Sequence, residues 1–209
     1  MTVKNFIDQN KDIFYFKTLE RHLQGCKSVL DIGCGDDSPL RRVKKTFSSH
    51  GVDAFAPSIK KSKAKKIHDT YTTSDLLKID KLFKPNSFDA VIALDVIEHF
   101  DKKTAKVLIK KMEKIARKKI ILLTPNGFYP QDAYGNNPWQ VHKCGWSKKE
   151  FEDLGYKVYG LRGPKFLRGD YATILYKPWI FWGLVAFITE PFLHFTPSLS
   201  YDLFGVKRK

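Results

Sequence analysis

Apolar runs that end in an acidic residue recur along the first half of the chain, and they predict its sheet. The first, residues 28–32 with the sequence SVLDI, is followed at once by the two glycines of GCGD. Residues 50–53, 72–77 and 87–95 repeat the form, with an acid at or near the end of each run. Short apolar runs of this kind are typical of buried strands in parallel sheets. A fifth run, residues 120–124, is stopped by a proline.

Segments with helical patterns separate these runs. Residues 101–118 carry apolar side chains at helical spacing on one face and lysines on the others. Ser147, with Glu150 three residues later, forms a capping-box pattern at the start of another helix. Strands that alternate with helices predict a doubly wound parallel sheet. The predicted helices span residues 3–24, 38–47, 58–67, 101–118 and 147–154.

The second half of the chain departs from this alternation. A long segment rich in aromatic and hydrogen-bonding side chains runs from Pro125 to Trp146, and loops of this length are more often functional than not. Because it leaves the carboxyl end of a central strand, we expect it to form a wall of the substrate pocket. Residues 156–161 and 171–176 are predicted to be the last two strands.

The glycines at positions 33 and 35 indicate a turn whose backbone a ligand can approach closely. Ser38 stands where a dinucleotide-binding motif has its third glycine, which argues against a pyrophosphate here and so against NAD or FAD. Asp53 follows the loop by about 20 residues, where such folds hold ribose hydroxyls. The pattern therefore favours a ligand with ribose and adenine but no phosphate; a glycine-rich turn without a ligand is the alternative.

The motifs around these acids resemble those of the class I S-adenosylmethionine-dependent methyltransferases. The shared residues are VLDIGCG at 29–35, DLL at 75–77 and SFDAV at 87–91. The chain looks especially like an uncharacterised prokaryotic branch with GCGxxSPL, LDVIEH, TPNGF and GWS motifs, over residues 28–176. The resemblance implies a Rossmann-like, seven-stranded, mostly parallel sheet with helices on both faces and an antiparallel C-terminal hairpin. It also implies S-adenosyl-L-methionine as the cofactor, with methyl transfer to an acceptor by in-line displacement.

The same resemblance assigns roles to residues at the strand ends. It implies that Asp53 accepts hydrogen bonds from both ribose hydroxyls, and that Asp75, with the backbone of Leu76, reads the adenine edge. Asp31 is expected to orient the ammonium group through water, whereas Asp89, at the start of its strand, is expected to be structural. The expected cofactor-binding residues are Asp31, Gly33, Cys34, Gly35, Asp53, Asp75, Leu76, Leu94 and Asp95.

Catalytic and substrate-binding candidates lie after the fourth strand and in the long loop. His99 and His142 are candidate general bases because neutral imidazole accepts a proton near neutral pH; for each, fixing a cap or a loop is an equal alternative. Tyr134, Trp139 and Gln140 are candidate substrate contacts, unless they only pack the loop. No metal site is predicted, since the three cysteines form no metal-ligand pattern and are interpreted as reduced thiols of a cytosolic protein.

The formal net charge of +15 favours partners that carry negative charge. A balance this basic is typical of proteins that meet nucleic acid, an anionic membrane or an acidic substrate, although a solvated lysine-rich surface has the same composition. The basic residues gather on predicted crossover helices, away from the expected cleft, so we favour a small-molecule or lipid-linked acceptor. An RNA methyltransferase and a cofactor-binding scaffold without turnover are the alternatives, and the oligomeric state is left open.

Residues 178–209 form an apolar, basic-ended segment, which we separate from a methyltransferase domain at 1–177. The uncharged run at 178–189 is shorter than the ~20 residues that span a bilayer. Tryptophans at one end and basic residues 207–209 at the other suit a segment that lies in the headgroup region. Packing on the domain and contact between copies are the alternatives. With no apolar signal at residues 1–5, the sequence predicts a cytoplasmic protein that is peripheral at the inner face of the membrane.

Overall fold

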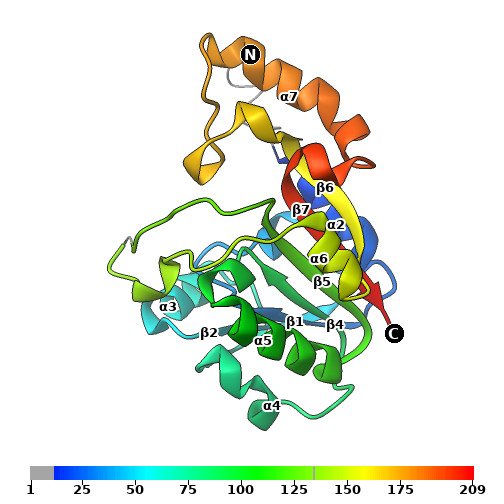
Figure 1. Ribbon diagram of the computed structural model, residues 1–209. Helices are drawn as coiled ribbons and strands as arrows, with labels where there is room; N and C mark the ends of the chain where they lie inside the picture. Colours follow the sequence, from blue (N-terminus) through cyan, green and yellow to red (C-terminus); the bar gives the residue numbers. More distant parts are fainter. Residues whose placement is uncertain (1–11, 134) are drawn as a thin grey trace.

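The computed structural model describes residues 12–133 and 135–209, which are built around one seven-stranded sheet (Figure 1). The strand order is β3-β2-β1-β4-β5-β7-β6. The first five strands are parallel, and β7 runs antiparallel to both of its neighbours, β5 and β6. The strands are β1 (Ser28–Ile32), β2 (Ser48–Asp53), β3 (Thr70–Thr73), β4 (Phe88–Leu94), β5 (Ala116–Pro125), β6 (Lys157–Pro164) and β7 (Ser200–Arg208). This is the Rossmann-like sheet with an antiparallel end that the sequence predicted.

Helices cover both faces of this sheet (Figure 1). They are α2 (Ile13–Leu23), α3 (Ala56–Ala64), α4 (Ile79–Leu82), α5 (Lys102–Ile115), α6 (Lys148–Asp153) and α7 (Trp179–Leu193). Side chains alternate between the two faces of a strand, so β1 packs Leu30 and Ile32 in the core under α5 and Val29 in the core under α2. Each fully buried aliphatic side chain of this kind contributes about 1.5–3 kcal/mol to folding.

Helix starts follow the capping signals in the sequence. The side chain of Asp101 accepts a hydrogen bond from the Thr104 N–H at the start of α5, which buries Leu108 on its apolar face. At the start of α6, Ser147 and Glu150 form the predicted capping box, in which each side chain bonds the other's backbone N–H. These two helices are confirmed to within a few residues.

The helix predicted at residues 38–47 is wrong. Only a short 3-10 turn, Pro39–Arg42, forms there, and Val43 is already extended. Leu40 and Val43 are the buried apolar side chains of this segment. One turn is enough to bury them. A longer helix here would have no apolar face to pack on the core, because the residues around Leu40 and Val43 are basic.

The strand predicted at residues 171–176 is also wrong. The second strand of the antiparallel end is β7, which lies between β5 and β6 and is buried from Ser200 to Val206. Residues 165–172 instead contain short 3-10 turns, and Arg168 makes an isolated bridge with Ile174. Strand pairing in the described chain therefore crosses the predicted boundary between residues 177 and 178.

The basic end of the chain packs on the domain instead of pointing into a headgroup layer. Lys207 Nζ lies 2.9 Å from a carboxylate oxygen of Glu113, and Lys209 Nζ donates to the carbonyl of Ala116 at 2.8 Å. These contacts hold the end of β7 against α5 and β5, so Lys207 and Lys209 bind groups of the protein itself, while membrane contact of the segment 178–209 stays a prediction. None of the described helices is both long enough and apolar enough to cross a membrane.

Candidate functional site

The loop after β1 takes backbone angles that favour glycine. Gly33 and Gly35 have φ values of +68° and +58°, in the left-handed region. A Cβ on Gly33 would lie 2.6 Å from Cγ2 of Val96, whereas a Cβ on Gly35 would meet no atom within 4 Å. The backbone at Gly35 therefore faces open space, which a ligand can approach closely.

Asp53 joins this loop to the carboxyl end of β2. Its Oδ2 accepts a hydrogen bond from the Gly35 N–H at 2.9 Å, and its Oδ1 accepts one from the Phe55 N–H at 2.8 Å. A carboxylate oxygen has more than one lone pair, so both oxygens can still accept a bond from a ligand hydroxyl. The loop is thus held in place by the acid that the sequence assigns to ribose.

Asp31 is the buried acid beneath the loop. Its Oδ2 accepts a hydrogen bond from the Ser38 hydroxyl at 2.5 Å, and His68 Nε2 lies 3.4 Å from the same oxygen. Burial raises the pKa of Asp31 to about 7. Ser38, in the place of a third glycine, therefore fixes Asp31, a role that the sequence pattern did not indicate for either Ser38 or His68.

Two neighbouring cavities lie along this edge of the sheet. The larger, here the loop cavity, has a volume of about 400 Å³, and the smaller, here the edge cavity, about 60 Å³. Both are lined by Gly33, Asp95, Asn137 and Gln140. Every residue expected to bind the cofactor lines one or both of them, namely Asp31, Gly33, Cys34, Gly35, Leu94 and Asp95 in the loop cavity and Asp53, Asp75 and Leu76 in the edge cavity. The structure brings the set together, while the individual roles stay predictions.

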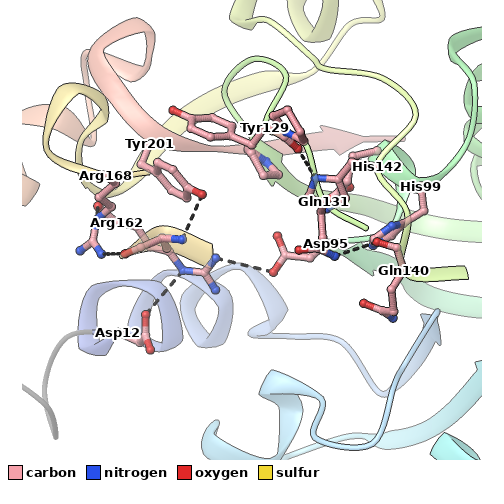
Figure 2. Close-up of a pocket in the computed structure, with 14 residues that line it drawn as sticks. Asp12, Asp95, His99, Tyr129, Gln131, Gln140, His142, Arg162, Arg168 and Tyr201 are labelled. Carbon is pink, nitrogen blue, oxygen red and sulfur yellow. Dashed lines mark hydrogen bonds and ion pairs between the residues drawn. The ribbon is translucent and has the colours of Figure 1, made fainter. Parts of the chain in front are cut away.

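A third cavity, here the polar cavity, opens beside the loop cavity and has a volume of about 370 Å³ (Figure 2). The two share Asp12, Asp95, Gln140 and Arg162. Of the candidate substrate contacts, Gln140 lines the polar cavity, whereas Trp139 lines the edge cavity. Tyr134 lies outside the described residues. The other polar side chains that line the polar cavity are Glu98, His99, Tyr129, Gln131, His142, Arg168 and Tyr201.

The long loop between β5 and α6 forms one wall of the polar cavity, as its position in the sequence predicted. Its two ends are held together, because the Gly127 N–H donates to the Trp146 carbonyl at 2.7 Å. Asn126 Nδ2 donates to the Ser200 carbonyl at 2.9 Å, which fixes the start of the loop to β7. The TPNGF and GWS motifs thus position the loop, and its residues Tyr129, Gln131, Gln140 and His142 face the cavity.

His99 and His142 lie side by side at this wall (Figure 2), with ring centroids 4.8 Å apart. His99 Nδ1 is 3.2 Å from the Val141 carbonyl, and His142 Nδ1 is 2.7 Å from the Tyr129 carbonyl. A carbonyl only accepts, so each Nδ1 carries the hydrogen and each Nε2 keeps its lone pair. Burial, with a smaller contribution from His142, lowers the pKa of His99 to about 4. The ring of His99 is therefore neutral at physiological pH.

Arg162, at the end of β6, is a cavity residue that the sequence did not indicate. Its guanidinium lies 2.9 Å from Asp202, 3.6 Å from Asp95 and 3.5 Å from Asp12. Asp202 is fully buried on β7, and its burial raises its pKa to about 7 against the opposing effect of Arg162. The positive φ of Arg162, +61°, comes just before Gly163, and no motif marks it. These acids come from three separate segments, so only the fold brings them to one arginine.

Known proteins resemble this chain in sequence over one segment and in structure over almost all of it. Residues 30–124 match a family model described as a methyltransferase domain, and no curated protein matches the sequence. A SAM-dependent methyltransferase from Archaeoglobus fulgidus is 20% identical, with a TM-score of 0.61 over 100% of this chain and 95% of that one. The methyltransferase domain of bacterial CtHen1 is 21% identical, with a TM-score of 0.57 over 96% and 99%. Phosphoethanolamine N-methyltransferase 2 of Haemonchus contortus, bound to S-adenosyl-L-methionine, is 17% identical, with a TM-score of 0.60 over 97% and 52%.

The sheet order and the loop after β1 are those of the class I methyltransferase fold, and residues 30–124 match a methyltransferase domain. The solved structures that share this fold include S-adenosylmethionine-dependent methyltransferases, and S-adenosylmethionine is the cofactor that the motifs at the strand ends indicated. The described residues fit that cofactor, because the open backbone at Gly35 leaves room for it and Asp53 and Asp75 present carboxylates to the edge cavity. Asp75 also caps the turn that follows it, since its Oδ1 accepts a hydrogen bond from the Leu77 N–H at 2.9 Å.

Proposed function

We propose that this enzyme transfers a methyl group from S-adenosylmethionine to a small-molecule or lipid-linked acceptor that binds in the polar cavity. The observation that carries the proposal is the junction of the two larger cavities at Asp95, Gln140 and Arg162. A ligand in the loop cavity and a second molecule in the polar cavity would meet there. The volume of about 370 Å³ is in the range of small-ligand pockets.

The cofactor residues keep the roles that the resemblance implies. When bound, S-adenosylmethionine supplies an electrophilic methyl group on its sulfonium. Asp53 would hold the ribose hydroxyls, and Asp75 with the backbone of Leu76 would read the adenine edge. Asp31, beneath Gly33 and Gly35, would face the methionine part, as would Leu94 and Asp95. The work of these residues is to hold one reactant in line with the other and to exclude water from the junction.

The acceptor meets a wall that carries hydrogen-bond acceptors and cations. His99 and His142 each keep a free Nε2 lone pair, and His99 is neutral, so either can accept a proton or hold a polar group of the acceptor. Arg168 is held in place by its own bonds, since its Nη1 donates to the Ala172 carbonyl at 2.5 Å. Such a pocket suits a polar acceptor head whose oxygen groups form hydrogen bonds.

The apolar surface of α7 supports presentation of the acceptor at a membrane. Most of the exposed large apolar side chains of the described chain lie between Phe166 and Leu199, with Trp179 at 61% and Phe192 at 74% exposure. α7 contacts the strand that carries Arg162, because the Glu190 carboxylate accepts a hydrogen bond from the backbone N–H of Arg162 at 2.9 Å. A membrane under α7 would therefore place a lipid-linked acceptor close to Arg162.

The basic residues of α3 give less support to an RNA acceptor. Lys61 lies 3.5 Å from Asp36, and Lys65 lies 3.3 Å from Asp37. These ion pairs join α3 to the loop after β1, so part of the basic surface is already matched by the protein's own acids. They leave fewer free cations near the loop for phosphates.

Methyl tracing tests the proposed function. The purified enzyme and methyl-labelled S-adenosylmethionine are added to a lysate, which is then separated into lipid, RNA, protein and soluble small-molecule fractions. We expect the label in the lipid or small-molecule fraction. Label in RNA that is sensitive to nuclease overturns the proposed acceptor class. Calorimetry on the same preparation separates the scaffold alternative, which predicts cofactor binding with no incorporation into any fraction.

A further inference from the structure

Three potential metal ligands meet at the inner wall of the polar cavity. Glu98 and His99 lie on the 3-10 turn Ile97–His99, directly after β4, and His142 comes from the long loop. One ligand atom from each of the three lies within 4.8 Å of the others. We propose that Glu98, His99 and His142 form a binding site for a divalent transition-metal cation, a site that the sequence pattern did not predict.

Glu98 supplies an observation that points to a ligand. Its side chain is 2% exposed, yet neither carboxylate oxygen has a hydrogen-bond partner among the described residues. The buried hydroxyl of Thr124 interacts with the Glu98 carboxyl and lowers its pKa against the effect of burial, but the two groups form no well-aligned hydrogen bond. An unpaired buried carboxylate is costly, and a cation coordinated by its oxygens would satisfy it.

The two imidazoles are oriented as metal-bound histidines usually are. Each donates its Nδ1–H to a backbone carbonyl, of Val141 for His99 and of Tyr129 for His142. Such outer hydrogen bonds fix the tautomer and leave Nε2 as the ligand atom. No side chain in the described part of the chain forms a hydrogen bond with either Nε2.

Arg162 does not oppose a metal at this site. Arg162 lines the same cavity, but its charge is matched by Asp202 at 2.9 Å, Asp95 at 3.6 Å and Asp12 at 3.5 Å. Asp95 lines the cavity together with Glu98, so the side chains near the proposed site include two carboxylates. The local charge thus favours a cation.

The donor set selects the kind of metal. Two imidazole nitrogens and one carboxylate suit manganese, iron(II), cobalt or zinc, whereas calcium and magnesium prefer oxygen ligands and copper(I) prefers thiolates. Three protein ligands leave coordination positions open. The open positions face a cavity of about 370 Å³, which is large enough to admit part of an acceptor.

This site, which rests on the proposed function, indicates an acceptor with a metal-binding hydroxyl. A hydroxyl bound to the cation would release its proton to solvent at neutral pH, because the metal stabilises the alkoxide. The acceptor oxygen would then form a bond to the methyl carbon as the carbon–sulfur bond breaks, with the bond's electron pair left on sulfur. His99 and His142 would act as ligands and not as direct general bases.

The test is metal binding by the purified full-length enzyme after dialysis against a chelator. We expect one Mn²⁺ or Co²⁺ per chain by calorimetry, and visible absorption bands of coordinated Co²⁺. Glu98→Gln and His142→Ala are each expected to weaken binding at least tenfold. His50→Gln is the matched control, since the His50 ring contacts Thr70 and Thr72 on β3 and does not line the polar cavity.

Two results would overturn the site. One is the absence of cation binding at 0.1 mM metal, and the other is unchanged affinity in both Glu98→Gln and His142→Ala. Thermal melting of each variant identifies any that fail to fold, and His142, on a loop, is the safer of the two positions. S-adenosylmethionine affinity is measured on the same samples. If the wild type binds S-adenosylmethionine but no metal, the metal site is refuted and the proposed function is not. If the tracing experiment shows no methyl incorporation, the proposed function is refuted.

Discussion

The two halves of the site differ in how they are built. On the cofactor side, each candidate residue lies at or just after the carboxyl end of a parallel strand, on a short loop such as the one that Asp53 holds to Gly35. On the acceptor side, Arg162, Asp202 and Glu190 come from β6, β7 and α7 and are part of the packed interior. Substitutions on the cofactor side should therefore mainly change ligand affinity, whereas those on the acceptor side should first change the stability of the fold.

Removal of the Arg162 side chain is the strongest test of that difference. Arg162→Leu leaves Asp202 buried without its partner at 2.9 Å. We expect a loss of about 3–5 kcal/mol in the free energy of unfolding at pH 8, measured by urea denaturation. The double variant Arg162→Leu, Asp202→Leu should recover much of that loss, because the fully buried carboxylate of Asp202 is no longer present without its partner. A single variant as stable as the wild type would show that the acceptor side does not depend on this pair.

A pH series on Glu190 tests the same half with a smaller effect. Burial raises the pKa of Glu190 to about 7, well above its ordinary value. Between pH 4.5 and pH 7 the folded chain therefore holds a proton that the unfolded chain has released, so this group makes the wild type less stable as pH rises. Glu190→Gln has no such group. Its stability relative to the wild type should improve by on the order of 2 kcal/mol from pH 4.5 to pH 8, and a constant difference would contradict the assignment.

Asp53→Ala tests the cofactor side. We expect S-adenosylmethionine to bind at least tenfold more weakly by calorimetry, about 1.4 kcal/mol, because the ribose hydroxyls lose their acceptor. The free energy of unfolding should change by less than it does in Arg162→Leu, since Asp53 is only half-buried and bonds two loop N–H groups. Asp89→Asn is the control at the opposite end of the sheet, where Asp89 accepts from the Lys27 N–H. Unchanged cofactor affinity in Asp53→Ala would refute the ribose role.

Substitutions on α7 are expected to change membrane contact and little else. Trp179→Ser, Ile188→Ser and Phe192→Ser combined replace side chains that are 61%, 59% and 74% exposed. The triple variant should lose flotation with anionic liposomes, while its stability stays within about 0.5 kcal/mol per site. Val107→Ser, on the exposed side of α5, is the control. If the wild type itself does not float, the membrane proposal is wrong; self-association in solution would then point to contact between copies.

Deletion of the chain after residue 177 would not test membrane contact by itself. Such a deletion would remove β7, which pairs with both β5 and β6, and with it Asp202, the buried partner of Arg162. Its effect on membrane contact could not be separated from its effect on folding. The substitutions on α7 leave the sheet intact.

Sequence alone was sufficient to predict the parallel strands and to choose candidate cofactor residues that the fold brings together. Its signals are local: an apolar run, a turn that needs glycine and an acid at a strand end lie within a few residues of one another, so spacing is enough to place them. The role of Ser38 could not be predicted in this way. Its hydroxyl donates a hydrogen bond to Asp31, and no sequence motif marks that bond.

Tertiary structure alone decided the last strand and the acceptor side. The sequence pattern favoured residues 171–176 as the last strand, whereas packing between β5 and β6 selects residues 200–208. Likewise His142 comes more than 40 residues after the neighbours Glu98 and His99, yet the loop brings all three to one wall. Contacts between distant segments depend on the whole packed core, and no local pattern of residues determines them.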